Sequence, residues 1–275
     1  MADRLLNYGF AILLIAAYVL AADPLERMWI VASLFVCSSV VLVAYLNNYF
    51  TIDGAGSALA VSVISVGLGS WPGALLLIFF FASHHVLTWW FGMPDHPVVS
   101  NRKNGMEIWS DTFWYVLFIA LFFIFDKIWL MVAAVAAMAT VIAAGWASVT
   151  SQSQSGIATS ASAKQEMPSG DVGAFTFPGA LIAAAAVALV AVLYLITSLS
   201  LDARAGTVIA IAGFSGCFLD SYLGAIFQVH KSAARRLPGT GEKSLLAGLH
   251  QLITNRQGVT FLAAGISSAI AVLLY

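Results

Sequence analysis

The chain has 275 residues, of which 61% are hydrophobic and 9% charged. Soluble domains are about 45–50% apolar and about 25% charged, so a chain with a mean hydropathy of +0.92 lacks the polar surface of a water-soluble protein. Twelve basic and thirteen acidic residues give a formal net charge of −1, which argues against a nucleic-acid partner. The composition predicts an all-α polytopic membrane protein, a helix bundle surrounded by membrane lipids.

Apolar runs of nearly membrane-spanning length recur along the whole chain. Because a span needs about 20 mostly apolar residues, we predict about nine spans in a single integral membrane domain covering residues 1–275. The first is treated as a retained helix, because no clear cleavage site follows it. The fifth is short unless the polar turn Glu107–Asp111 also enters the membrane. The predicted spans are Leu5–Ala22, Met28–Phe50, Gly54–Ser70, Trp71–Gly92, Thr112–Phe125, Ile128–Ser148, Phe177–Leu199, Thr207–Val229 and Val259–Tyr275.

The basic residues of the connections indicate the orientation. With a cytoplasmic N-terminus, nine Lys and Arg residues fall on the inner side and three, Arg27, Lys127 and Arg204, on the outer side. Positive charges stay on the cytoplasmic side of membrane proteins, so we predict this orientation and place the chemistry at the cytoplasmic face. Three inner connections are long and polar: Met93–Ser110, residues 149–176, whose Gly/Ser-rich composition predicts a flexible loop, and the basic residues 230–258. The plasma (inner) membrane of a prokaryote is the simplest location.

The eighth predicted span carries the most informative polar pattern. On a helix with about 100° per residue, five of its residues share one face that runs toward the cytoplasm: Asp220, Ser221, Gly224, Gln228 and Lys231. A carboxylate inside a span is costly and usually marks a site or a pathway, and glycine lets a ligand or another backbone approach closely. We therefore favour a functional site on this face. The alternative is that Asp220 pairs with a cation and the glycines only pack helices.

A second group lies where an inner connection becomes the fifth span. Asn104, Glu107 and Asp111 have the spacing i, i+3 and i+7 and share a helix face. Two carboxylates four residues apart can hold Mg2+ together with phosphate oxygens. The alternative is a solvated helix start, where acidic residues favour the positive end of the helix dipole. The spacing leaves both interpretations open.

Two glycine-rich segments on the cytoplasmic side are further candidates for binding substrate or nucleotide. Their residues are Asp53, Gly54, Gly56, Gly170, Asp171 and Gly173. The first three open the third span, where backbone amides could cradle an anion, although a plain N-cap by Asp53 is the simpler interpretation. The other three belong to a small-residue loop that lacks the Lys-Ser/Thr ending of a Walker motif.

Cations and tryptophans mark the expected membrane interfaces. Lys231 and Arg235 follow the eighth span and could bind a phosphate headgroup, although such clusters more often contact the lipid surface. Trp89, Trp90 and Trp109 are typical of an interfacial aromatic belt.

Three segments carry a resemblance to a known family. The first is Asp53-Gly-Ala-Gly-Ser-Ala-Leu-Ala60 with the turn Gly67-Leu-Gly-Ser-Trp-Pro-Gly73, the second is Arg102-Lys-Asn-Gly-Met-Glu-Ile-Trp-Ser-Asp111, and the third, the closest match, is Leu219-Asp-Ser-x-Leu-Gly-Ala-x-x-Gln228. Together they resemble the family that contains plant phytyl-phosphate kinase and transmembrane protein 19, classed as domain of unknown function 92. The resemblance covers most of the chain.

The resemblance implies a reaction and a set of residues. Members with known chemistry phosphorylate an isoprenyl monophosphate to the diphosphate with a nucleoside triphosphate, which implies CTP or ATP as co-substrate, Mg2+ as cofactor, phosphates held by cytoplasmic loops and a prenyl tail in the bilayer. Asp220, Ser221 and Gln228 match the last motif by position. Glu107 and Asp111 stand where the family has Gln and Asn.

One family motif is altered in this chain. The family usually carries Asp-Thr-x-Ala-Ser-Glu at the end of the sixth span, where this chain reads Ala144-Gly-Trp-Ala-Ser-Val149 and has neither carboxylate. If those acids bind metal, the resemblance implies that Glu107, Asp111 or Asp171 has taken over the role. Otherwise catalysis is lost.

The leading hypothesis is therefore a membrane-embedded isoprenyl-phosphate kinase. Mg2+ would bridge Asp220 and the Glu107/Asp111 pair to the nucleotide phosphates, and Lys231 and Arg235 would neutralise developing charge. The rival from another class is a lipid-phosphate binding or translocating protein without kinase activity. A third hypothesis is a degenerate relative that only scaffolds partners, and whether the chain forms a homo-oligomer is left open.

Overall fold

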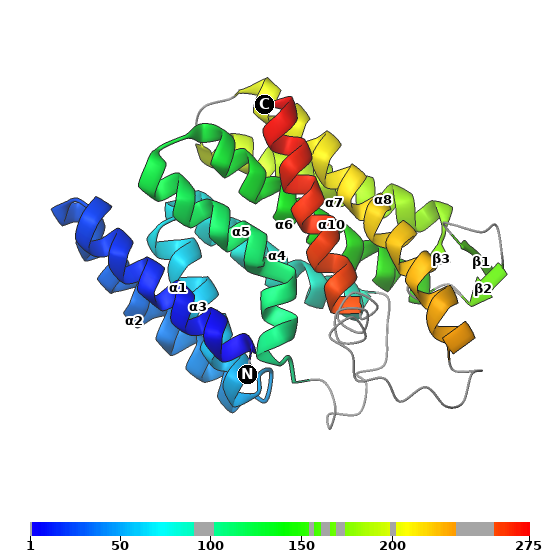
Figure 1. The fold of residues 1–275 in the computed structure, drawn as a ribbon, viewed down its shortest axis with the longest axis horizontal. Helices are drawn as coiled ribbons and strands as arrows, with labels where there is room; N and C mark the ends of the chain where they lie inside the picture. Colours follow the sequence, from blue (N-terminus) through cyan, green and yellow to red (C-terminus); the bar gives the residue numbers. More distant parts are fainter. Residues whose placement is uncertain are drawn as a thin grey trace.

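The computed structural model of the protein describes residues 2–90, 102–153, 157–160, 166–168, 174–198, 202–234 and 256–275. These residues form a bundle of helices with one small sheet (Figure 1). The helices are α1 (Ala2–Ala16) with its π-helical continuation η1 (Ala17–Ala21), α2 (Pro24–Leu46), α3 (Ile52–Gly67), α4 (Ser70–Trp90), α5 (Gly105–Phe125), α6 (Ile128–Ser153), α7 (Phe177–Ser198), α8 (Ala203–Ala234) and α10 (Arg256–Leu274). The strands β1 (Ile157–Ser160), β2 (Glu166–Pro168) and β3 (Ala174–Phe175) form an antiparallel sheet in the order β2-β1-β3.

The helices have the composition of membrane spans. Within the described residues, seven are long and apolar enough to cross a membrane, and α3 and the apolar part of α4, Ser70–Ser83, are shorter apolar helices. At 1.5 Å per residue, the 16 residues of α3 reach about 24 Å, less than the roughly 30 Å of a bilayer core. The predicted class, a helical integral membrane protein, is confirmed. The number of nine spans and the cytoplasmic N-terminus stay predictions.

Among the helix boundaries that differ from the sequence predictions, three affect polar segments. α2 begins at Pro24 because Asp23 forms a capping box with Glu26 and Pro24 stands at the first helical position. α5 begins at Gly105, so the polar turn Glu107–Asp111 is part of the helix. α6 continues to Ser153, beyond the predicted end. The expected flexible loop at 149–176 is therefore partly helix and, where it is described, partly sheet.

Helix α6 lies at the centre of the bundle. It packs against α4, α5, α7, α8 and α10, and 78% of its membrane-spanning part is buried. Small side chains let its neighbours come close, and hydroxyl groups then bond to carbonyls of adjacent helices. Ser267 of α10 donates to the carbonyls of Ala136 and Ala212 at 3.2 and 2.9 Å, and Thr140 of α6 donates to the carbonyl of Gly213 at 3.3 Å.

The two ends of the bundle are each held together by polar contacts. At one end, Arg4 of α1 pairs with Asp53 of α3 at 3.5 Å. At the other end, Tyr275 donates to Asp202, which precedes α8, at 3.0 Å. The start of α1 and the end of α10 lie at opposite ends (Figure 1). We call the end that holds the starts of α1, α3, α5 and α10 and the end of α8 the N-terminal end.

Candidate functional site

Asp220 faces the interior of the bundle near the N-terminal end. The Thr260 hydroxyl of α10 donates to Oδ1 of Asp220 on α8 at 2.9 Å. Gly213 and Gly216 lie on the same face of α8 and pack tightly against Val187 of α7 and Ser267 of α10. These two glycines therefore pack helices, which was the alternative interpretation for the glycines of this segment. Asp220 itself is half-buried, and its carboxylate is turned toward α10.

Thr260 is a site residue that the sequence did not reveal. It lies 40 residues after Asp220, and it reaches the carboxylate only because α10 packs along α8. Its position is fixed from the other side by α5, where the Trp114 indole donates to the carbonyl of the next residue, Phe261, at 2.9 Å. The one available signal was a threonine in the first turns of an otherwise apolar span.

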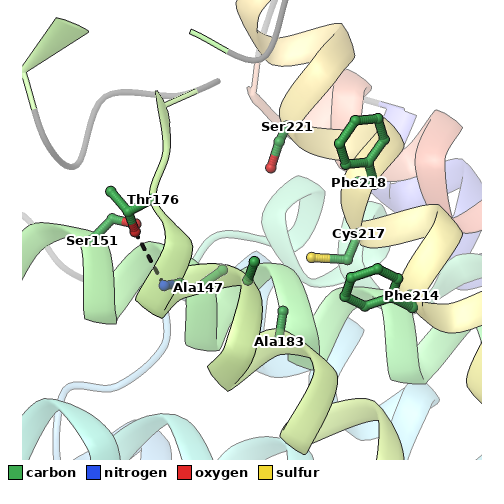
Figure 2. Close-up of a pocket in the computed structure, with 10 residues that line it drawn as sticks. Ala147, Ser151, Thr176, Ala183, Phe214, Cys217, Phe218 and Ser221 are labelled. Carbon is green, nitrogen blue, oxygen red and sulfur yellow. Dashed lines mark hydrogen bonds between the residues drawn. The ribbon is translucent and has the colours of Figure 1, made fainter. Parts of the chain in front are cut away.

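Ser221 points into a small pocket between α6, α7 and α8 (Figure 2). The pocket has a volume of about 20 Å³, which is room for a single water molecule. Its lining residues are Ala147, Ser151, Thr176, Gly179, Ala180, Ala183, Phe214, Cys217, Phe218 and Ser221. Thr176 closes one side, since its hydroxyl lies 3.1 Å from both the Ser151 hydroxyl and the Gly179 amide. Asp220 and Ser221 therefore meet different surroundings, α10 for the carboxylate and α7 for the hydroxyl.

The polar residues at the start of α5 mostly cap the N-terminus of this helix. Asn104 is the N-cap, and it forms a reciprocal capping box with Glu107, with distances of 2.9 and 3.1 Å. Both residues therefore act as the helix-start interpretation predicted. Asp111 lies one turn later, accepts a long hydrogen bond of 3.4 Å from Ser110 and pairs with Lys103 at 3.8 Å.

Lys103 is the second site residue that the sequence analysis missed. Its carbonyl accepts from the Thr51 amide at 3.2 Å and its amide donates to the Tyr49 carbonyl at 3.0 Å, so the segment before α5 is tied to the turn between α2 and α3. Gly54 packs directly on this carbonyl, where a Cβ would clash. Gly54 thus allows the backbone of Lys103 to come close to α3. A basic residue next to a polar helix start was the available signal.

The expected N-cap by Asp53 is wrong. Thr51 is the N-cap of α3, and its hydroxyl accepts from the Gly54 amide at 3.0 Å. Asp53 lies in the first turn and pairs with Arg4, and its side chain is 46% exposed. Gly56 packs near Asn7 of α1.

The three predicted metal ligands do not form one metal-binding group. Within the part of the chain that the structure describes, no three His, Cys, Asp or Glu side chains lie together in a way that could hold a metal ion. Glu107 is used in a helix cap, Asp111 pairs with Lys103, and Asp220 bonds to Thr260. The bridging arrangement of these carboxylates that the sequence suggested is therefore corrected to separate polar contacts on α5 and α8.

The remaining predicted residues lie on α8 or outside the description. Gly224 is buried on α8. Gln228 and Lys231 lie on the last turns of α8, with side chains outside the described part. The other candidates outside the described residues are Gly170, Asp171, Gly173 and Arg235.

The interfacial role predicted for Trp109 is wrong, because its side chain is only 1% exposed, whereas Trp89 and Trp90 are exposed as expected.

Comparison with known protein families gives a match over most of the chain. The family model described as "Integral membrane protein DUF92" matches residues 10–268. No curated protein and no solved structure shows significant similarity to the chain. The match spans nearly every described helix and includes both polar pairs, Asp220 with Thr260 and Lys103 with Asp111. The chain therefore belongs to the DUF92 family of integral membrane proteins.

Proposed function

We propose that this protein phosphorylates an isoprenyl monophosphate to the diphosphate at the cytoplasmic membrane face, with CTP or ATP as the phosphoryl donor and Mg2+ as cofactor. Family membership and the resemblance of residues 219–228 to the phytyl-phosphate kinase motif support this choice. The observation that carries it is the Asp220–Thr260 pair, a carboxylate oriented by a hydroxyl within an apolar bundle. A carboxylate is retained in such surroundings when it serves a site.

The residues of the site suit phosphoryl transfer in the following roles. This reaction needs charge neutralisation and alignment more than covalent chemistry from the protein. Mg2+ commonly binds one or two carboxylates plus substrate phosphates, so Asp220 suffices as the protein ligand, and the bound ion would neutralise phosphate charge. Thr260 holds the Asp220 carboxylate in place, whereas the neighbouring Ser221 faces the separate pocket between α6, α7 and α8. Lys231 and Arg235 are the proposed cations.

The direct test measures product formation. Purified full-length protein is incubated with phytyl or geranylgeranyl monophosphate, labelled CTP or ATP, and Mg2+, and labelled diphosphate is separated by chromatography. We expect Asp220→Asn to lower kcat by about 10²–10³-fold, the range for removing one preorganised electrostatic group. Asp126→Asn is the matched control, since Asp126 is exposed in the left-handed region (φ 49°), which Asn tolerates well. Absence of diphosphate with every nucleotide and chain length would overturn the proposal.

A lipid-phosphate binding or translocating protein is the second candidate. It is favoured by the end of α6, where the chain lacks both family carboxylates and where Ala147 lines the pocket. Thermal unfolding separates the two functions. Stabilisation by isoprenyl monophosphate alone, with no further shift from nucleotide and Mg2+, supports the binding protein. A nucleotide-dependent shift that Asp220→Asn abolishes supports the kinase.

A further inference from the structure

Hydrogen bonds and close packing fix the backbone of Lys103 in place. The segment forms a parallel bridge with Phe50, with backbone hydrogen bonds on both sides of that residue. Gly54 packs against the Lys103 carbonyl and leaves no room for a side chain there. The neighbouring Arg102 is turned to the exposed side and donates to Asn48. This clamp fixes the direction in which the Lys103 side chain leaves the backbone.

The Lys103 ammonium lies between an aromatic ring and a carboxylate. It is 5.5 Å from the centre of the Phe80 ring of α4 and 3.8 Å from Oδ2 of Asp111 on α5. A close charge-assisted hydrogen bond would measure about 2.7–2.9 Å, so the pair with Asp111 is loose. The side chains of Lys103 and Asp111 are 40% and 24% exposed. A partly exposed ion pair of this kind contributes little to stability, and the ammonium stays accessible to a stronger anion.

We propose that Lys103 anchors the phosphate group of a lipid phosphomonoester at the N-terminal end, and that Asp111 holds the ammonium until the phosphate displaces it. The inference rests on the proposed function, because it assigns the residue that receives the substrate's phosphate. A phosphate monoester carries about −1.5 to −2 charges and three acceptor oxygens, and therefore outcompetes a single carboxylate for the ammonium.

The surroundings of Lys103 favour a lipid over a soluble phosphate. The rings of Phe50, Phe80 and Phe81 form a connected aromatic group beside the ammonium, with centroid distances of 6.4 Å for Phe50–Phe81 and 5.0 Å for Phe80–Phe81. Phe81 of this group is only half-buried, so the aromatic group reaches the surface of α4. A phosphate bound here can leave its prenyl chain along α4 in the bilayer.

A purely structural role makes the opposite prediction for one variant. If the Lys103–Asp111 pair only fastens α5 to the turn between α2 and α3, Asp111→Asn weakens that attachment and gives no gain in ligand binding. If Asp111 competes with the phosphate, Asp111→Asn releases the ammonium and strengthens binding. The sign of the change in affinity therefore separates the two roles.

The experiment measures binding without nucleotide or Mg2+. Full-length protein in a neutral detergent is titrated with geranylgeranyl monophosphate, and separately with inorganic phosphate, and Kd is obtained from intrinsic tryptophan fluorescence. We expect Lys103→Met to weaken lipid monophosphate binding by about 10–100-fold, the range for loss of a hydrogen bond to a charged group. Asp111→Asn should strengthen it by up to about fivefold. Lys127→Met, the same change at an exposed residue immediately before α6, should leave Kd unchanged.

Each outcome decides the inference. An unchanged Kd for Lys103→Met overturns the inference. An unchanged or weaker affinity for Asp111→Asn also overturns it, and this variant decides the question by itself if Lys103→Met does not fold. Inorganic phosphate binding as tightly as the lipid monophosphate overturns the lipid assignment. Because no phosphoryl transfer is measured, retained Lys103-dependent binding with no kinase activity contradicts only the proposed kinase function. Kinase activity that is independent of Lys103 contradicts only this inference.

Discussion

Two regions of the bundle are held together in different ways. In the α1–α2–α3 region, only 11% of the α1 span and 22% of the α2 span are buried. In the α6–α8–α10 region, 78% of the α6 span is buried. Figure 1 shows these regions on opposite sides of the bundle. Lipid tails are as apolar as leucine, so burial of apolar surface does not drive helices together inside a membrane. Each region needs another source of attachment.

The α1–α2–α3 region is attached mainly by hydrogen bonds from side chains to neighbouring helices. Trp29 of α2 donates to the carbonyl of Val66 in α3 at 2.7 Å. Asn7 of α1 accepts from Ser57 of α3 at 3.1 Å and from Trp109 of α5 at 2.8 Å. A few specific bonds thus connect helices whose surfaces are mostly exposed.

The α6–α8–α10 region is attached by small residues at close range. A Cβ added at Gly216 of α8 would lie 2.8 Å from the Ser267 Cβ of α10, and it would clash with Thr140 of α6. Ser268 adds a bond to the Ala133 carbonyl at 3.1 Å. Close approach brings many weak contacts and satisfies hydroxyls on neighbouring carbonyls. The α6–α8–α10 region thus depends mainly on small residues at close range, whereas the α1–α2–α3 region combines such packing, at Gly67 against Ser33, with hydrogen bonds from tryptophan side chains.

The largest expected loss of stability comes from removing Trp109, which attaches α5 to α1. Trp109→Ala removes a side chain that is 1% exposed, stacks on Phe10 at 4.6 Å and donates to Asn7. We expect the free energy of unfolding to fall by about 3–5 kcal/mol, measured by denaturation in mixed micelles. Trp90→Ala, at a residue that is 73% exposed, is the control and should cost far less. Equal losses for the two variants would contradict the anchoring role.

A smaller effect tests the central region. Gly216→Ala adds one methyl group where there is no space, and we expect a loss of about 1–3 kcal/mol from overpacking. Gly9→Ala is the matched control on α1, where nothing lies within 4 Å of the added Cβ. Since Ala favours helix over Gly by about 0.5–1 kcal/mol, this control should be neutral or stabilising. A neutral Gly216→Ala would show that close packing does not hold α6, α8 and α10 together.

The smallest effect concerns the end of the central region opposite the candidate site. Burial raises the pKa of Tyr275, and its hydrogen bond to Asp202 raises it further. Because the folded-state pKa lies above the unfolded value of about 10, this stabilisation is complete below pH 10 and is lost as pH rises through the folded-state pKa. We expect Tyr275→Phe to be less stable than the parent at neutral pH and to lose less stability on going to higher pH.

The control for this pH dependence is Tyr8→Phe, at a tyrosine that is 68% exposed. Thermal unfolding in detergent between pH 7 and about pH 11 compares the three proteins. A pH profile for Tyr275→Phe that parallels the parent would show that this bond does not fasten α8 to α10.

Local patterns were predictable where one helix alone decides them. The spans follow from apolar runs, and the interior orientation of Asp220 agrees with its place on the polar face of α8. The capping roles of Asn104 and Glu107 were one of two readings that their spacing allowed. Trp109 was misassigned because a tryptophan near a span end has the same sequence signature at an interface and in a core. Only the packing of α1 and α5 distinguishes these positions.

The amino-acid sequence by itself determined that this chain is a helical membrane protein, because its apolar runs have the length of a bilayer and too few charges for water. It also determined which residues are polar inside those runs. Only the tertiary structure decided their partners: Thr260 for Asp220, and Asp111 with Phe80 for Lys103. The physical reason is the distance along the sequence between the residues that interact. A helix forms from contacts three or four residues apart, whereas the orientation of a buried charge depends on which distant helix packs against it.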